Sequence, residues 1–132
     1  MATVRKGMVI EASPDYVWSA VRDVGALARV FPGVVKEVRM EGNLRVLTYQ
    51  NGIVLREWVV TVDDALRRLV VCASGGRIAH FQSAVQVFAE TPDRSHVVWT
   101  CDFLPDMLTE TVQTIVDRGT EAAKGVLERG EY

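Results

Sequence analysis

Residues 106–128, with the sequence DMLTETVQTIVDRGTEAAKGVLE, decide the fold of this chain. Apolar and small side chains recur there at three- and four-residue steps, which places them on one face of a single long helix. The residues on that face are Met107, Leu108, Thr111, Val112, Ile115, Val116, Gly119, Ala122, Ala123, Val126 and Leu127. Strand-like segments precede this helix, and because a helix and a sheet each have an apolar face to bury, we expect the helix to pack across a curved sheet. Such an arrangement commonly leaves an internal cavity, so the pattern favours a protein with a ligand pocket.

Ahead of this helix the chain is a series of strands joined by short turns. Alternation and turn residues predict strands at residues 3–11, 34–41, 44–50, 53–62, 68–73, 79–90 and 96–103. The pairs Gly42-Asn43 and Asn51-Gly52 predict two-residue hairpin turns, and therefore antiparallel neighbours. Ser13 followed by Pro14 is a helix-start signal, and residues 26–30 predict a second short helix.

Composition sets the class of protein. With 132 residues, 48% hydrophobic and 24% charged, the chain is expected to be one globular domain covering residues 1–132. A net charge of −2 without a basic patch argues against a nucleic-acid or anionic-membrane partner. No segment resembles a signal peptide or a membrane span, and Cys72 and Cys101 stand alone without metal-ligand spacing. We therefore expect a cytoplasmic protein without metal or cofactor.

Several ordered motifs carry a resemblance to a known superfamily. They are IEASPDYVW at 10–18, FPGVV at 31–35, LREWVVTVDD at 55–64, VVW at 97–99 and FLP at 103–105. Together they resemble the START and birch-pollen-allergen superfamily, also called SRPBCC, over nearly the whole chain. The sequence is most similar to its small bacterial members labelled polyketide cyclase/dehydrase or lipid-transport-like. The resemblance implies an α+β helix-grip fold, in which a curved antiparallel sheet of about seven strands wraps around the long C-terminal helix, with two short helices after the first strand. Because the superfamily mixes enzymes, carriers and receptors, it does not fix the function.

The resemblance also indicates which face of each strand lines the cavity. Residues 55–61 are largely apolar on both faces, so hydrophobicity alone does not choose between them. Plant abscisic-acid receptors have a similar Glu-Arg-Leu-x-x-x-Asp-Asp pattern whose Glu lines the pocket, which implies that Glu57 points inward and Trp58 outward. By alternation Leu55, Val59 and Thr61 then share the inner face with Glu57, and Arg56 lies outside with Trp58. The receptors' Asn-Tyr-x-Ser pattern is similar to residues 80–83, which implies Phe81 and Ser83 in the pocket.

The remaining candidates come from the pattern and from position. Residues 97, 99, 101 and 103 form one apolar face of the last strand, and Met107, Thr111 and Ile115 follow at four-residue steps that would cap the cavity. Phe31 stands near the place where those receptors carry a pocket Lys. The predicted ligand-binding residues are therefore Phe31, Leu55, Glu57, Val59, Phe81, Ser83, Trp99, Phe103, Met107, Thr111 and Ile115.

Glu57 has two interpretations. As an inward carboxylate on an apolar strand it would suit a general acid/base or a hydrogen-bond partner for a ligand hydroxyl. Alternatively it is a surface residue paired with Arg56 or with an Arg of a neighbouring strand. His80 has the opposite parity to Phe81, which makes it an exposed or structural residue rather than a site residue.

Three functions remain open from the sequence. The first is binding or transport of a small hydrophobic or aromatic molecule in the cavity. The second is a cyclase, aromatase or dehydratase in which Glu57, with Tyr49 or Ser83, transfers protons. The third is a dimerising domain with a filled cavity, held through an exposed stripe that contains Trp58 and Val60. A monomer and a homodimer are equally compatible with the sequence.

Overall fold

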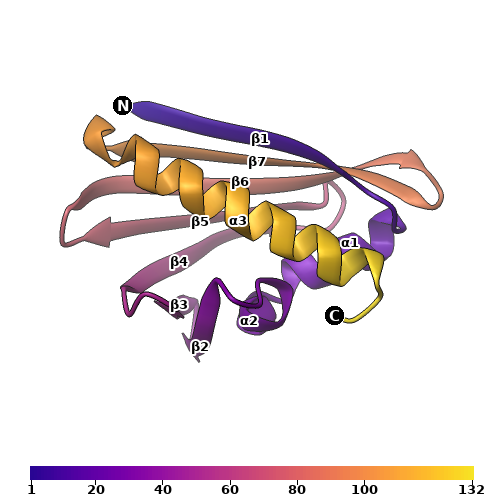
Figure 1. Ribbon diagram of the computed structural model, residues 1–132, viewed down its shortest axis with the longest axis horizontal. Coiled ribbons are helices and arrows are strands. Elements are labelled where there is room, and N and C mark those ends of the chain that lie inside the picture. Colours follow the sequence, from indigo (N-terminus) through magenta and orange to yellow (C-terminus); the bar gives the residue numbers. More distant parts are fainter.

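The computed structural model describes all residues, 1–132, and contains one seven-stranded antiparallel sheet with helices on a single face (Figure 1). The strand order is β1-β7-β6-β5-β4-β3-β2. The strands are β1 (Ala2–Ile10), β2 (Val35–Glu41), β3 (Leu44–Tyr49), β4 (Val54–Asp63), β5 (Arg68–Gly75), β6 (Ile78–Thr91) and β7 (Arg94–Leu104). The helices are α1 (Pro14–Arg22), the 3-10 turn η1 (Val24–Ala26), α2 (Leu27–Val30), the 3-10 turn η2 (Asp106–Leu108) and α3 (Thr109–Glu128). The predicted helix-grip architecture is confirmed.

Local sequence signals determine where α1 begins. The Oγ atom of Ser13 accepts a hydrogen bond from the backbone N–H of Tyr16 at 3.2 Å, and Pro14 occupies the first turn. These are the preferred residue types at those two positions, because the first amides of a helix have no partner within it. The chain then turns through η1 into α2, so the two short helices after the first strand are as predicted.

The two short hairpins differ in loop length. Glu41 pairs with Leu44, so Gly42-Asn43 is a two-residue turn as predicted. The second prediction is wrong by one residue: the N–H of Tyr49 donates to the carbonyl of Ile53 at 2.9 Å, which leaves three residues, 50–52, in the loop. Gly52 has φ +86°, the left-handed conformation that commonly closes such a loop. This extra residue sets the register between β3 and β4.

Helix α3 crosses the concave face of the sheet beside β1 (Figure 1). Two polar contacts hold α3 against β1 and the residue that follows it. Lys6 Nζ lies 2.7 Å from Asp117 Oδ1, and the N–H of Glu11 donates to Glu128 Oε2 at 2.8 Å. The larger core cluster joins the later turns of α3 to α1, α2 and the middle of the sheet, and includes the fully buried Ile10. A smaller cluster lies under the first half of α3.

The opposite, convex face of the sheet has no covering helix. On β4 the exposed apolar side chains of this region are Val54 (56% exposed), Trp58 (57%) and Val60 (59%). This set, called here the β4 stripe, agrees with the predicted outward orientation of Trp58. No helix in the structure has both the length and the apolar character that crossing a bilayer requires.

A bulge in β4 between Val59 and Thr61 reverses the alternation. Val62 therefore pairs with the inner-face Leu69, and Thr61, predicted to point inward, pairs with Val70 on the convex face.

Candidate functional site

The inner face of the sheet brings most predicted site residues into neighbouring cross-strand rows. Paired residues of antiparallel strands point to the same face, so the strand register identifies each row. The first row contains Glu57, Ala73, Phe81 and Phe103 from β4 to β7, and the next contains Val59, Val71, Ser83 and Cys101. Trp99 lies in the following row, opposite Val85. The inner face of this part of the sheet is therefore apolar except for Glu57 and Ser83.

Burial of the predicted residues varies along α3 and the sheet. Phe103, Glu57 and Ser83 are buried, whereas Phe31, Leu55, Val59, Phe81, Trp99 and Ile115 are half-buried. Met107 is 84% exposed, and Thr111 is exposed as well. The predicted set thus extends from the interior to the surface at the start of α3.

Glu57 forms a buried ion pair with Arg45 of the adjacent strand β3. The Nε and Nη2 atoms of Arg45 donate to Oε1 of Glu57 at 3.1 Å and 2.8 Å, and Nη1 donates to the carbonyl of Val24 at 3.2 Å. Each of the two charged side chains is only 5% exposed. Glu57 is thus inward and buried rather than on the surface, and it is paired with an Arg of a neighbouring strand.

The second carboxylate oxygen of Glu57 remains free. Both hydrogen bonds from Arg45 end on Oε1, and Oε2 accepts none. Oγ1 of Thr120 is the one fully buried side-chain polar atom without a hydrogen-bond partner. Since Oε2 also has no partner, it is not fully enclosed and borders residual open space. An ionised carboxylate oxygen accepts hydrogen bonds only, so this position suits a ligand N–H or O–H group.

Tyr49 adds a second polar group to the same region. By parity on β3 it shares the inner face with Leu47 and Arg45. Burial, together with the nearby negative charge of Glu57, raises the pKa of the Tyr49 phenol. The hydroxyl is therefore neutral and can donate a hydrogen bond.

An aromatic stack separates this region from the larger core cluster. Phe31 lies nearly parallel to Trp99, with ring centroids 5.6 Å apart and an interplanar angle of 16°. The indole N–H of Trp99 donates to Ser83 Oγ at 2.7 Å, which fixes the ring. A Cβ atom on Gly119 would lie 3.1 Å from Trp99 Cζ3, so the helix rests directly on the indole. Glycine at this position allows that close approach.

Cys101 lies beside Ser83 on the same face and is fully buried. Burial raises the pKa of its thiol to about 12, although a hydrogen bond with Ser83 partly opposes this rise. The thiol is therefore neutral at physiological pH, and since the thiolate is the nucleophilic form, Cys101 is not suited to nucleophilic catalysis.

A surface pocket lies where α3 begins, here called the mouth pocket. Its volume is ≈ 430 Å³, and its lining residues are Arg77, Pro105, Met107, Leu108 and Thr111. Leu108 packs against the smaller core cluster, which contains Phe103 and contacts Phe81. The mouth pocket therefore adjoins the first inner row of predicted site residues.

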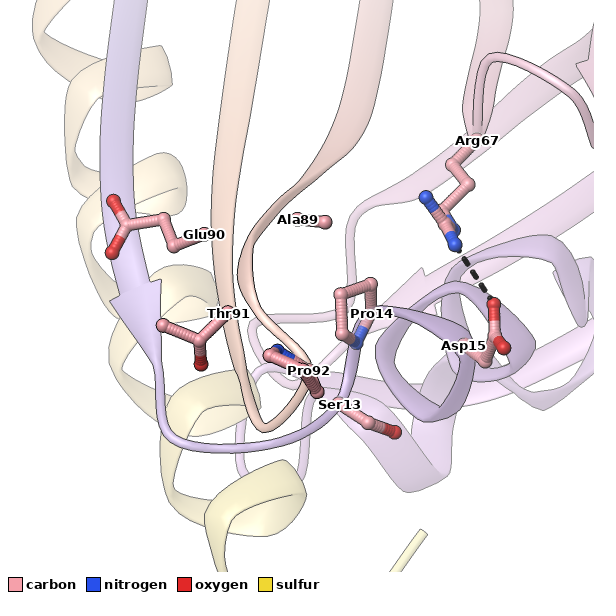
Figure 2. A pocket seen from close by; sticks show the side chains of 8 residues that line it. All are labelled: Ser13, Pro14, Asp15, Arg67, Ala89, Glu90, Thr91 and Pro92. Carbon is pink, nitrogen blue, oxygen red and sulfur yellow. Dashed lines mark hydrogen bonds and ion pairs between the residues drawn. The ribbon is translucent and has the colours of Figure 1, made fainter.

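A second pocket of ≈ 500 Å³ lies at the other end of the sheet (Figure 2). It is formed by the start of α1, the β4–β5 turn and the β6–β7 hairpin, and five of its eight lining residues are polar or charged: Ser13, Asp15, Arg67, Glu90 and Thr91. Its single cation, Arg67, is already paired with Asp15 at 2.9 Å. None of the predicted ligand-binding residues lines this pocket.

Sequence reasoning missed Arg45 and Arg77, and it left Tyr49 outside the predicted ligand-binding set. Arg45 carried a signal, because it lies in a strand, β3, that a short turn joins to the strand of Glu57. Arg77 lies in a Gly-Gly-Arg turn and carried no pattern that distinguishes it from a solvated charge. Trp18 does not join the site, because its indole N–H donates to Asp64 Oδ1 at 2.9 Å on another part of the molecule.

Comparison with solved structures shows the same fold in other proteins. The protein XoxI from Bacillus cereus aligns with a TM-score of 0.89 and 20% identity, over 100% of this chain and 99% of that chain. A START superfamily protein from Mycobacterium smegmatis aligns with a TM-score of 0.83 and 15% identity, over 96% of this chain and 97% of that one. Norcoclaurine synthase from Thalictrum flavum, solved in complex with dopamine and hydroxybenzaldehyde, aligns with a TM-score of 0.75 and 15% identity, over 95% and 85% of the two chains. At these identities the likeness concerns the fold alone.

Comparison of the sequence with known families gives the classification. No curated protein sequence matches the chain. The family model described as polyketide cyclase / dehydrase and lipid transport matches residues 1–128. The chain therefore belongs to the polyketide cyclase / dehydrase and lipid transport family.

Proposed function

We propose that this protein binds a small, largely apolar or aromatic molecule between the inner face of the sheet and α3. The observation that carries the proposal is the Arg45–Glu57 pair, which leaves Oε2 of Glu57 free on an otherwise apolar face. Ligand sites typically combine apolar walls with a few fixed polar groups. Membership in a family that includes lipid transport, and a fold that holds two aromatic molecules in norcoclaurine synthase, agree with such a role.

The geometry favours a ligand with a hydrogen-bond donor. Arg45 compensates the charge of Glu57, so the pair offers no net charge to a ligand, whereas Oε2 offers an acceptor. Ala73, Phe81 and Phe103 stand in the same cross-strand row as Glu57, and they give a hydrocarbon surface that suits a flat or branched ligand. A phenol-like molecule meets both conditions.

The proposal is tested first by native mass spectrometry of the freshly purified protein, compared with its mass after denaturation. Extra mass that is lost on denaturation would give the mass of a bound molecule. The second test compares 1-naphthol with 1-methylnaphthalene, which has the same ring system without a donor. We expect 1-naphthol to bind about ten- to a hundredfold more tightly, because a hydrogen bond to a charged group contributes roughly 1.5–3 kcal/mol.

Variants locate the site of binding. Glu57→Gln should remove most of the preference for 1-naphthol over 1-methylnaphthalene. Trp99→Phe should lower the affinity for both compounds. Trp58→Phe is the matched control, because Trp58 lies on the convex face and is 57% exposed. A protein that is purified without ligand and whose melting temperature responds to neither compound does not have the proposed function.

The enzyme interpretation receives less support from the geometry. Proton transfer by Glu57 would disturb its pair with Arg45, and the raised pKa values of Tyr49 and Cys101 keep both groups neutral. A general base would therefore have to be a group other than Tyr49 or Cys101.

The dimer interpretation is favoured by one observation, the exposed β4 stripe. Exposed apolar patches mark interaction sites more often than scattered apolar residues do. If a second copy of the chain covers the stripe, the protein should elute as a dimer in size-exclusion chromatography and Trp58→Glu should elute as a monomer. Elution of the unmodified protein as a monomer would rule out this alternative.

A further inference from the structure

The mouth pocket combines apolar walls with one cation. Pro105, Met107 and Leu108 supply hydrocarbon surface, and Thr111 supplies a hydroxyl. Its volume of ≈ 430 Å³ lies within the range of known small-molecule sites, about 300–1,000 Å³. The high exposure of Met107 (84%) is unusual for an apolar side chain that lines a pocket. A ligand chain in the pocket would remove this apolar surface from water, which is favourable.

Arg77 is the cation of this pocket, and its guanidinium has no ion-pair or hydrogen-bond partner in the protein. Asp106, the acid that directly precedes Met107, is instead paired with the N-terminal ammonium group of Met1 at 3.3 Å. Glu110 is adjacent to Thr111 on α3 and therefore projects about 100° away from it around the helix. A guanidinium presents a fork of donors that matches a carboxylate. The pocket thus has an unused anion-binding group next to unused apolar surface.

We infer that the mouth pocket binds an amphipathic carboxylate, with its carboxylate on Arg77 and its hydrocarbon chain on Met107 and Leu108. This inference rests on the proposed function and adds a class of ligand to it, because Leu108 also packs on the cluster beside Phe81. A chain that starts at Arg77 is thereby directed toward the inner face of the sheet. The polar end stays in solvent, where its remaining hydrogen-bonding capacity is satisfied by water.

The test is a titration of ¹⁵N-labelled protein with octanoate, followed by amide chemical shifts. We expect saturable shifts at residues 76–78 and 105–111, and we expect 1-octanol to bind at least about tenfold more weakly, because it lacks the charge that pairs with the guanidinium. Arg77→Gln should lower the affinity for octanoate by about tenfold and leave the affinity for 1-octanol unchanged. Arg77→Lys should recover part of the octanoate affinity, because it restores the charge without the fork.

Arg5→Gln is the matched control. Arg5 is also exposed and without an ion-pair partner, but it lies on the convex side of β1. Its substitution should change the octanoate affinity by less than about twofold, because an exposed charge at that distance is largely screened. Equal binding of octanoate and 1-octanol, or equal effects of Arg77→Gln and Arg5→Gln, would overturn the inference.

Two further results separate the possible failures. If octanoate has no effect while the protein sediments with phosphatidylglycerol vesicles, the anion belongs to a lipid surface and the inference of a free carboxylate is wrong. If octanoate has no effect while 1-naphthol still shifts the indole N–H signal of Trp99, the inference fails and the proposed function stands. Octanoate binding at residues 105–111 without any response to 1-naphthol would support the inference and contradict the proposed inner site.

Discussion

Removal of one partner of the Arg45–Glu57 pair should strongly destabilise the fold. In Arg45→Met the carboxylate of Glu57 loses both of its hydrogen bonds and its compensating charge while its side chain is only 5% exposed. Breaking a buried pair in this way typically costs about 3–5 kcal/mol, because an uncompensated charge remains in the interior. At this chain length the melting temperature changes by roughly 4 °C per kcal/mol, so we expect a decrease of about 12–20 °C.

Replacement of both partners should be far less harmful. In Arg45→Met/Glu57→Leu no charge remains to be buried, and apolar replacements of buried pairs are often neutral or stabilising. We expect this double variant to have a free energy of unfolding within about 1 kcal/mol of the unmodified protein. The two single variants and the double variant form a thermodynamic cycle, which isolates the coupling between the side chains.

The assay is urea unfolding monitored by circular dichroism and tryptophan fluorescence, with linear extrapolation to water. Arg56→Met is the matched control, since Arg56 is on the same strand as Glu57 but is 57% exposed and lies 3.8 Å from Glu41. We expect it to change the free energy of unfolding by less than about 1 kcal/mol. If Arg45→Met lowers the free energy of unfolding no more than Arg56→Met does, the Arg45–Glu57 pair is hydrated in solution and not buried.

Three further predictions concern other parts of the molecule. Gly119→Val should lower the free energy of unfolding by about 1–3 kcal/mol in the same urea assay, because even its Cβ would lie 3.1 Å from Trp99 Cζ3. The disulfide reagent DTNB at pH 8 should label only the half-exposed Cys72 in the native protein, because burial raises the pKa of the Cys101 thiol to about 12. After unfolding it should label both thiols, and rapid labelling of both in the native protein would contradict the structure. Burial and a hydrogen bond to a neighbouring carboxylate raise the pKa of Tyr132 from 10.0 to about 12, so its contribution to stability is fully present below pH 10 and is lost between pH 10 and 12. The unfolding curves of the unmodified protein and of Tyr132→Phe should therefore converge over that range, and parallel curves would show that the phenol titrates normally.

The fold could be predicted from the sequence because its signals are local and mutually consistent. The three- and four-residue spacing of α3, the Ser13-Pro14 helix start and the turn at Gly42 each depend only on residues close in the chain. The orientation of β4 needed the resemblance to a known superfamily, because hydrophobicity alone did not distinguish its two faces.

The polar part of the site could not be predicted because it depends on the register of one hairpin. A two-residue turn at Asn51-Gly52 would place Val46 opposite Glu57, whereas the observed three-residue loop places Arg45 there. A one-residue change of register exchanges the two faces of a strand. The length of this loop, longer by one residue than predicted, therefore determines whether Glu57 is an isolated acid or part of a buried ion pair. The periodicity of the sequence does not indicate that length.

The two ends of the candidate site place different requirements on a ligand. At the inner end the Arg45–Glu57 pair is neutral overall and leaves one acceptor, so it selects a donor and gives no advantage to charge. At the outer end Arg77 is an unpaired cation beside apolar side chains, so it selects an anion. Octanoate and 1-naphthol therefore report on different ends of the site, and Glu57→Gln should change the affinity for 1-naphthol but not the affinity for octanoate. A natural ligand that satisfies both ends would carry a hydroxyl on its buried part and a carboxylate at the mouth, and it should lose affinity in both Glu57→Gln and Arg77→Gln.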